Sequence, residues 1–183
     1  MKNLFVILLL FATANIAIAQ SKAAPGDLRV IIIRHAEKPA EGDNLSCRGL
    51  NRAMALPAVI TKRFGVPDYV YVPSPSTGKA TKSVRMLQTI SPMAIKFNLP
   101  VNTKYDVDDT TGLVNNLTKK TGTALLVWEH DAIEKIATKL GVSGKPKWPG
   151  NDYDSIWIIT IHNGKAALVK TKEGIKVGDS CAF

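Results

Sequence analysis

The sequence predicts an α/β fold with three layers, α/β/α, in which a mostly parallel sheet is completed by a C-terminal β-hairpin. Short apolar strands alternate with helical segments over residues 28–140, an order typical of a parallel sheet covered by helices. The segment 30–33 is apolar and β-branched at every position, as expected of a central strand buried on both faces. Near the C-terminus, Asn163-Gly164 separates two further strand-like segments, which indicates a hairpin.

Two strand–helix units are predicted in the first half of the chain. The first strand, 28–33, is followed by Ser46, a preferred N-cap residue, and by a helix that runs to about Phe64. The segment 68–72 combines β-branched and aromatic residues, as in a second strand, and a second helix is expected from about Lys79. Helical spacing places two sets of residues on one face of their helix: Leu50, Met54, Ala58 and Thr61 in the first, and Val84, Leu87, Ser91 and Ala94 in the second. Each helix of the first half contains a proline, Pro57 or Pro92, which predicts a kink or a break there.

The second half of the chain continues the alternation of strands and helices. A helix running through Lys120 can take its N-cap from residues 108–111. The remaining segments are strands at 101–107, 123–128, 155–161 and 165–171, and a helix at 132–140 that buries Ile133, Ile136, Ala137 and Leu140.

Residues 1–19 have the pattern of a secretory signal peptide, which leaves a single domain at 20–183. Lys2 supplies the positive start, residues 4–11 supply the apolar core, and Ala-Ile-Ala ending at position 19 supplies a small-residue cleavage motif. The apolar core is too short for a good membrane span, and no cysteine near the cleavage motif offers a lipid anchor. We therefore expect an exported protein, periplasmic or secreted, with no stable membrane anchor.

The chain is basic, with a formal net charge of +9, or +8 once Lys2 is removed with the leader. A basic balance suits an anionic ligand such as a phosphate, a nucleic acid or an acidic surface. The lysines are scattered, however, and no nucleic-acid-binding motif matches, so we expect no nucleic-acid partner. Nothing in the sequence predicts the oligomeric state.

Two cysteines, Cys47 and Cys181, would meet an oxidising compartment after export. A disulfide that joins the first helix to the C-terminus is compatible with the sequence, and so are two free thiols. Metal binding by this pair alone is not expected, because no further cysteine or histidine completes a metal-binding pattern.

Two of the predicted parallel strands end abruptly in charged and polar residues. Arg34 and His35 follow the first strand, and Glu129-His130-Asp131 follow the strand at 123–128. Because the carboxyl ends of parallel strands meet at one edge of a sheet, both imidazoles are expected to face one pocket there. Helix N-termini also point toward that edge, which favours an anionic ligand.

Histidines accompanied by arginines at strand ends suit phosphoryl transfer. A neutral imidazole can attack phosphorus and form a covalent intermediate. Guanidinium groups match the phosphoryl oxygens in shape and neutralise their charge. A carboxylic acid is then needed to protonate the leaving oxygen.

Four segments carry a resemblance to a known family. Ile33-Arg34-His35-Ala36-Glu37 resembles the Arg-His-Gly-Glu motif of the histidine phosphatase superfamily, the phosphoglycerate mutase-like fold, with alanine in place of the glycine. The other three segments occur in the family order across most of residues 28–140. They are Leu45-Ser46-Cys47-Arg48-Gly49-Leu50, Ser74 with Arg85-Met86-Leu87-Gln88-Thr89, and Val127-Trp128-Glu129-His130.

The resemblance implies roles for individual residues. It implies that His35 is the nucleophile that becomes phosphorylated, and that Arg34, Arg85 and His130 bind the phosphoryl group. Asp131 matches the proton donor of the acid-phosphatase branch, and Glu129, on the other side of His130, is a rival for that role. Lys38 is added to the binding residues because of its charge and its closeness in sequence, not because of a shared motif. No metal and no cofactor are expected.

The expected function is that of an exported, metal-independent phosphatase that hydrolyses phosphomonoesters of small molecules through a phosphohistidine on His35. A non-catalytic phosphate- or polyanion-binding protein of the same fold is the alternative, because the proton donor is uncertain from sequence. A metal-dependent hydrolase would use His35, Glu37, His130 and Asp131 as ligands, and a mutase is a further possibility within the fold. The loops that would select a substrate carry no readable pattern.

Overall fold

The computed structural model describes residues 23–76 and 83–181, so the predicted leader at 1–19 lies outside the described residues. The described part holds six strands and four helices, which alternate along most of the chain as predicted. In chain order the elements are β1 (Leu28–Arg34), α1 (Cys47–Phe64), β2 (Tyr69–Tyr71), α2 (Val84–Phe97), β3 (Val101–Asn102), α3 (Thr110–Leu117), β4 (Gly122–Trp128), α4 (His130–Lys139), β5 (Ser155–His162) and β6 (Lys165–Lys172).

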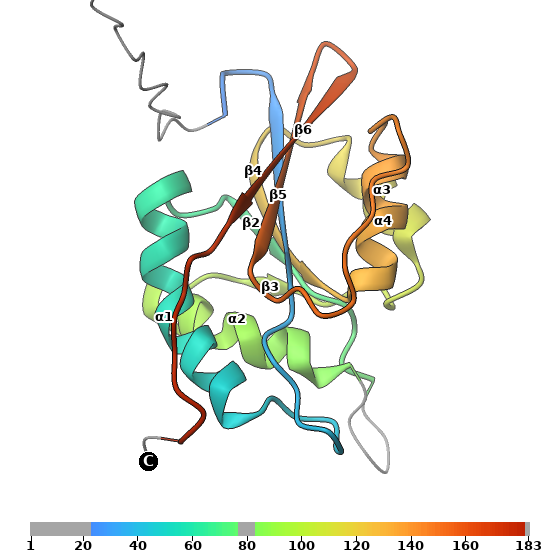
Figure 1. Cartoon of the computed structure of the whole chain (residues 1–183). Coiled ribbons are helices and arrows are strands. Elements are labelled where there is room, and N and C mark those ends of the chain that lie inside the picture. Colours follow the sequence, from blue (N-terminus) through green and yellow to red (C-terminus); the bar gives the residue numbers. More distant parts are fainter. Residues whose placement is uncertain (1–22, 77–82, 182–183) are drawn as a thin grey trace, which may run out of the picture.

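The strands form one sheet between two layers of helices, with α1 and α2 on one face and α3 and α4 on the other (Figure 1). The strand order is β3-β2-β4-β1-β5-β6; the first four strands are parallel, and β5 and β6 add an antiparallel hairpin. Alternate residues of β1 serve the two faces, because Val30 and Ile32 pack with α3 and α4, whereas Ile31 and Ile33 pack with α1 and α2. The predicted three-layer α/β/α class is confirmed.

The buried face of α1 differs from the face noted in the sequence. Ala53, Leu56 and Ile60 are fully buried against the sheet, whereas Met54 is 64% exposed. This helix carries two apolar stripes, and the one with Met54 lines a groove between α1 and α2 instead of the core. The helix passes through Pro57 without a break.

The buried face of α2 is also shifted from the spacing noted in the sequence. Its buried side chains are Met86, Thr89, Ile90 and Met93, one or two positions from the expected set. Apolar residues surround most of this helix, so spacing alone does not select the face that packs on the sheet. The helix starts at Val84 among the described residues and continues through Pro92.

Smaller differences concern element ends. The third strand, expected over 101–107, is limited to Val101–Asn102, and α4 begins at His130 instead of residue 132. Ser46 caps α1 as predicted, since its side chain accepts a hydrogen bond from the Gly49 amide. No helix in the described residues is long and apolar enough to cross a membrane.

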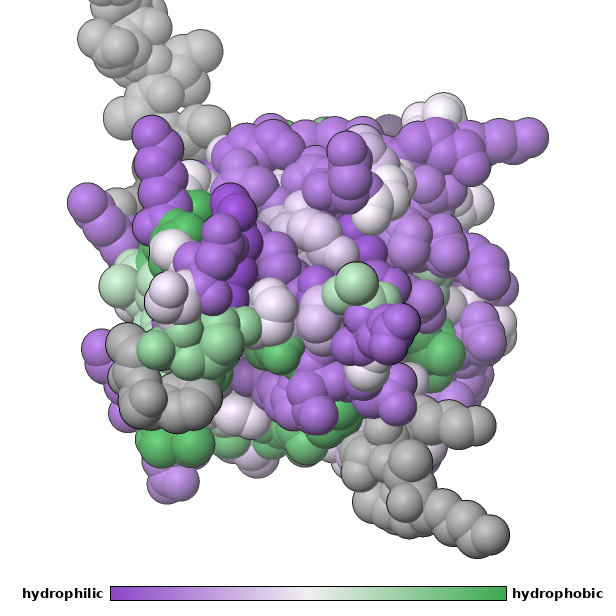
Figure 2. Space-filling view, turned by 60° about the horizontal axis from the view of Figure 1, so that its bottom comes forward, coloured by the Kyte–Doolittle hydropathy of each residue, from purple (hydrophilic) through white to green (hydrophobic). Residues whose placement is uncertain are grey.

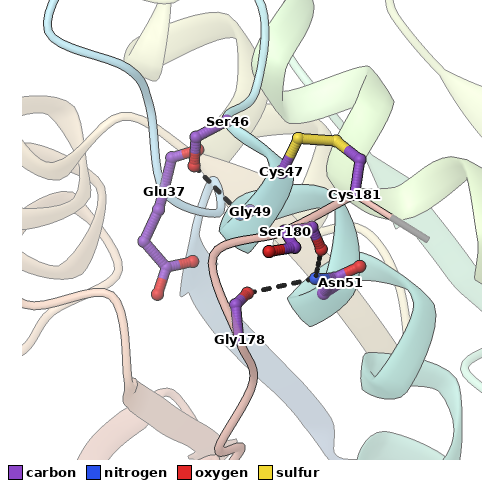
Figure 3. Close-up of a disulfide and its surroundings, with 8 residues drawn as sticks. All are labelled: Glu37, Ser46, Cys47, Gly49, Asn51, Gly178, Ser180 and Cys181. Carbon is purple, nitrogen blue, oxygen red and sulfur yellow. Dashed lines mark hydrogen bonds between the residues drawn. A yellow bond between two sulfur atoms is a disulfide. The ribbon is translucent and has the colours of Figure 1, made fainter.

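Cys47 and Cys181 form a disulfide, which settles the pairing that the sequence left open (Figure 3). The bond joins residues that are 134 positions apart and fastens the C-terminal tail to the first turn of α1. Asn51 strengthens this attachment, because its side-chain amide donates to the carbonyls of Gly178 and Ser180. The tail therefore packs along the helix that follows the first motif (Figure 1).

Removing the disulfide by Cys181→Ser should lower the free energy of unfolding by about 2–5 kcal/mol. The unfolded chain is then no longer closed into a long loop, so its conformational entropy is higher. Urea denaturation of the wild type and of the variant, each with and without reductant, measures this. Reductant should weaken the wild type to the level of the variant and leave the variant unchanged. Equal midpoints for all four samples would contradict the prediction.

Candidate active site

The pairing of β1 with β4 brings two polar strand ends to the same level of the sheet. Arg34 lies opposite Trp128 in the parallel register, and the His35 amide donates to the Trp128 carbonyl at 3.1 Å. His35 thus follows β1 where Glu129 and His130 follow β4. We call this the site edge; Figure 2 brings this end of the molecule forward and shows a largely hydrophilic surface with smaller hydrophobic patches.

His35 is held as a neutral imidazole with one ring nitrogen engaged. Only 4% of the residue is exposed, and Nδ1 lies 2.7 Å from the Ala36 carbonyl oxygen. A carbonyl only accepts, so Nδ1 carries the hydrogen and Nε2 keeps its lone pair. Burial lowers the pKa of His35 to about 4; the bond to Ala36 opposes this shift, and the charges of Arg34 and Arg85 add to it.

His35 opens into a small cavity of about 100 Å³, whose described lining residues are His35, Ser83, Arg85, Met86 and Glu129. Arg85 comes from the first turn of α2, and its guanidinium donates to the carbonyls of Gly42 and Asn44. These bonds tie the Arg85 side chain to the loop before α1. The cavity therefore combines an imidazole, a guanidinium and a carboxyl group from three separate segments, a set of groups that suits phosphoryl transfer.

Arg34 is the last residue of β1 and is 4% exposed. Its Nη1 donates to the Gly150 carbonyl at 2.5 Å, and its guanidinium carbon lies 4.0 Å from the centre of the Tyr153 ring. The buried Nε has no hydrogen-bond acceptor among the residues that the structure describes. A buried guanidinium donor without an acceptor is costly, and an anionic oxygen is the ligand that would satisfy it.

His130 is the first residue of α4 and follows β4 two residues after Trp128, whose carbonyl accepts from the His35 amide. A Cβ atom at Gly150 would lie 3.5 Å from His130 Nε2, so the backbone of that glycine packs against the ring. The strand register and the cavity therefore place His35, Arg34, Arg85, Glu129 and His130 at the site edge.

Asp131 and Lys38, the other two expected site residues, do not line the His35 cavity. Asp131 has a side chain that is 76% exposed, with an oxygen 3.4 Å from His130 Nε2. Lys38 is exposed and lines a separate, larger cleft of about 560 Å³ together with Arg48 and Arg52. Of the two rivals for proton donor, Glu129 is the one that lines the His35 cavity.

Arg52 is a buried residue that sequence reasoning missed. It donates to both oxygens of Glu37, at 2.8 and 2.7 Å, and to Glu173 at 2.8 Å. Burial alone would raise the pKa of Glu37, but the hydrogen bonds from Arg52 outweigh burial and hold this pKa below its usual value. Burial raises the pKa of Glu173 to about 7. An arginine in mid-helix normally indicates a solvated charge, and Glu173 lies in a tail without a recognisable pattern, so the sequence held no signal for this cluster.

The ion pair with Arg52 removes Glu37 from the ligand set of a metal-dependent hydrolase. Within the described part of the chain, the group that could hold a metal ion is Glu129, His130 and Asp131, whose ligand atoms lie within 4.8 Å of one another. Neither His35 nor Glu37 belongs to that group. The four-ligand arrangement considered from the sequence is therefore not assembled.

The motif residues that do not face the cavity fix the backbone around it. Thr89 Oγ1 accepts from the Ala36 amide at 2.9 Å, and Gln88 Oε1 accepts from the Leu45 amide at 3.0 Å. Gly49 is required where α1 meets the loop after β1, because a Cβ there would lie 2.2 Å from the Glu37 carbonyl oxygen. The segments that resemble the family therefore meet in space.

Neither a family model nor a curated protein matches the sequence, but solved structures match its fold. The protein histidine phosphatase SixA, complexed with tungstate, gives a TM-score of 0.59 at 14% identity, covering 79% of this chain and 97% of that one. A phosphoserine phosphatase from Entamoeba histolytica gives 0.56 at 13%, covering 77% and 94%. The alpha-ribazole phosphatase from Shigella flexneri gives 0.55 at 14%, covering 82% and 99%. These matches confirm the expected phosphoglycerate mutase-like fold.

The His35 imidazole should titrate near pH 4 in the folded protein, instead of near ~6.5 as in an unfolded chain. The unfolded chain then binds more protons than the folded one between these values, so the stability contributed by His35 rises with pH across that window. NMR titration of ring-labelled histidine measures the pKa, with assignment by comparison with His35→Ala. Titration near 6.5 would show that water reaches the ring freely.

Proposed function

We propose that this chain, which has the fold of the histidine phosphatases, is a metal-independent phosphatase that hydrolyses phosphomonoesters through a phosphohistidine on His35. One observation carries the proposal. His35 is buried beside two guanidinium groups, with Nδ1 bonded to the Ala36 carbonyl and Nε2 left with its lone pair. That arrangement supplies a neutral nucleophile in surroundings that favour a phosphoryl anion.

The reaction follows from this geometry in two steps. In the first step, Nε2 of His35 attacks phosphorus, the ester P–O bond breaks, and Glu129 gives its proton to the leaving oxygen. Arg34, Arg85 and His130 bind the phosphoryl oxygens and offset the negative charge of these oxygens in the transition state. In the second step, water attacks phosphorus, the P–N bond breaks, and the Glu129 carboxylate takes the proton from the water. Phosphate leaves, and His35 returns to its neutral form.

Glu129 is our proposed proton donor because it lines the cavity into which His35 opens, whereas Asp131 does not line that cavity and has a largely exposed side chain. A site without a proton donor would favour a non-catalytic phosphate-binding protein. In our proposal Glu129 is that donor. The observations therefore favour an enzyme over that alternative.

His35→Ala should abolish hydrolysis of a chromogenic phosphomonoester, because no other group in the site replaces the nucleophile. His162→Ala is the matched control, since this third histidine lies in the β5–β6 hairpin and pairs with Asp27. The wild type and the control should also yield an acid-labile phosphoenzyme after brief exposure to labelled substrate, and hydrolysis should persist in EDTA. Equal rates for wild type and His35→Ala would overturn the mechanism.

Glu129→Gln should lower turnover by roughly 10²- to 10⁴-fold, the usual contribution of a positioned general acid. Asp131→Asn, the matched change two residues away, should have a far smaller effect. Steady-state rates with substrates of different leaving-group acidity separate the two, because only loss of the proton donor makes the rate depend steeply on the leaving group. A steep dependence in Asp131→Asn but not in Glu129→Gln would reverse the assignment.

We also propose that the protein acts after export, on phosphorylated small molecules. The leader-like pattern at 1–19 and the Cys47–Cys181 disulfide support this, because stable disulfides belong to oxidising compartments. N-terminal sequencing of the protein recovered from the cells should begin at Gln20. A chain that starts at Met1 in the cytosolic fraction would remove the proposal of export.

A further inference from the structure

A loop outside all four motif segments forms part of the site edge. The segment 148–154 is the last part of the connection between α4 and β5 and overlaps 142–152, one of the loops expected to select the substrate although they carry no readable pattern. It contacts three of the expected phosphoryl-binding and nucleophilic residues: Arg34 through Gly150 and Tyr153, His35 through Tyr153, and His130 through Gly150.

Tyr153 makes the aromatic contacts between this segment and the site residues. The Arg34 guanidinium lies over its ring, 4.0 Å from the ring centre, which is a cation–π distance. The His35 ring meets it edge-on, with 5.9 Å between the ring centres and 60° between the planes. One half-buried side chain therefore contacts both the nucleophile and the arginine next to it.

The rest of the segment holds Tyr153 in place. Asp152 accepts from the backbone amides of Asp154 and Ser155, from the Ser155 hydroxyl and from Lys172, and these bonds lower its pKa to about 2 although burial opposes the shift. Trp148, which is buried, donates its indole N–H to the Asp152 carbonyl. The loop is therefore fastened to β6 and to the core on either side of Tyr153.

We propose that Tyr153 is a positioning residue, whose ring fixes the Arg34 guanidinium for phosphoryl binding and keeps water from the His35 imidazole. This inference rests on the proposed function of the site, and it adds a residue that the motifs do not contain. The required feature is the aromatic face and not the hydroxyl, because both contacts are made by the ring.

Several other charges also act on His35, so the effect of Tyr153 must be separated from theirs. Arg34 from β1, Arg85 from α2 and His130 from α4 lower the pKa of His35, and the carboxyl group of Glu129 lines the same cavity. None of these groups changes its charge when Tyr153 is replaced by an uncharged side chain. A rise in the His35 pKa in such a variant therefore reports access of water to the ring or displacement of the Arg34 guanidinium, and both are consequences of losing the Tyr153 ring.

The test compares Tyr153→Phe with Tyr153→Leu in the full mature chain, by two measurements that need no turnover: the affinity for inorganic phosphate and the NMR titration of His35. Tyr153→Phe keeps the ring and should match the wild type within about twofold. Tyr153→Leu should bind phosphate roughly tenfold more weakly, a typical loss for a partly buried cation–π contact. Its His35 pKa should also rise from about 4 toward the value of a solvated imidazole.

Tyr69→Leu is the matched control, because Tyr69 is also partly buried under a cation, with Lys120 Nζ 4.4 Å from its ring centre, but lies in β2. It should leave both measurements unchanged. If Tyr153→Leu keeps the wild-type phosphate affinity and the wild-type His35 titration, the proposal is overturned. It is also overturned if Tyr153→Leu fails to fold while Tyr69→Leu folds, because the Tyr153 ring would then serve packing. Failure of His35→Ala to abolish hydrolysis would instead reject the proposed function and leave the titration result standing.

Discussion

The parallel register between β1 and β4 is the constraint on which the site depends. Because Arg34 lies opposite Trp128, the chain leaves both strands at one level, and the next residues of each strand become neighbours. The hydrogen bond from the His35 amide to the Trp128 carbonyl extends the ladder one residue beyond β1. A shift of one residue in this pairing would turn the side chains of one strand to the opposite face relative to the other strand, so that His35 and His130 would no longer follow their strands at one level.

Around this pair of strands, the motif residues act mostly through the backbone. Thr89 and Gln88 on α2 bind the amides of Ala36 and Leu45, which fixes α2, and with it Arg85, against the loop after β1. The close approach at Gly49 fixes α1 against the same loop. The disulfide at Cys47 then fastens the tail to the start of that helix. Rigid placement of this kind is what a site needs if its groups are to meet a phosphoryl anion without reorganisation.

The sequence predicted those parts of the fold that depend on local patterns. Continuous β-branched strands, the cap at Ser46 and the turn at Asn163-Gly164 each have a local physical cause, and the structure confirms all three. The sequence also predicted the site edge, because polar residues that follow a buried strand must face an opening. Helix faces were harder, because α1 and α2 carry apolar residues on more than one side, and Met54 lies on the exposed side of its helix.

The features that the sequence did not reveal depend on tertiary contacts between distant segments. The charge of Arg52 is compensated by Glu37 and Glu173, the second of which is 121 positions away. Tyr153 reaches the site only because the loop before β5 folds back over the end of β1. Our proposal of Glu129 over Asp131 as proton donor likewise rests on which of them lines the His35 cavity, since both flank His130 in the sequence.

If two strand ends and α2 bind one phosphoryl group together, a crystal structure with tungstate or orthovanadate will show how they do so. We expect the oxyanion within bonding distance of His35 Nε2, with its oxygens hydrogen-bonded to Arg34, Arg85 and His130. An anion bound instead in the cleft lined by Lys38 and Arg48, with the His35 cavity empty, would contradict it.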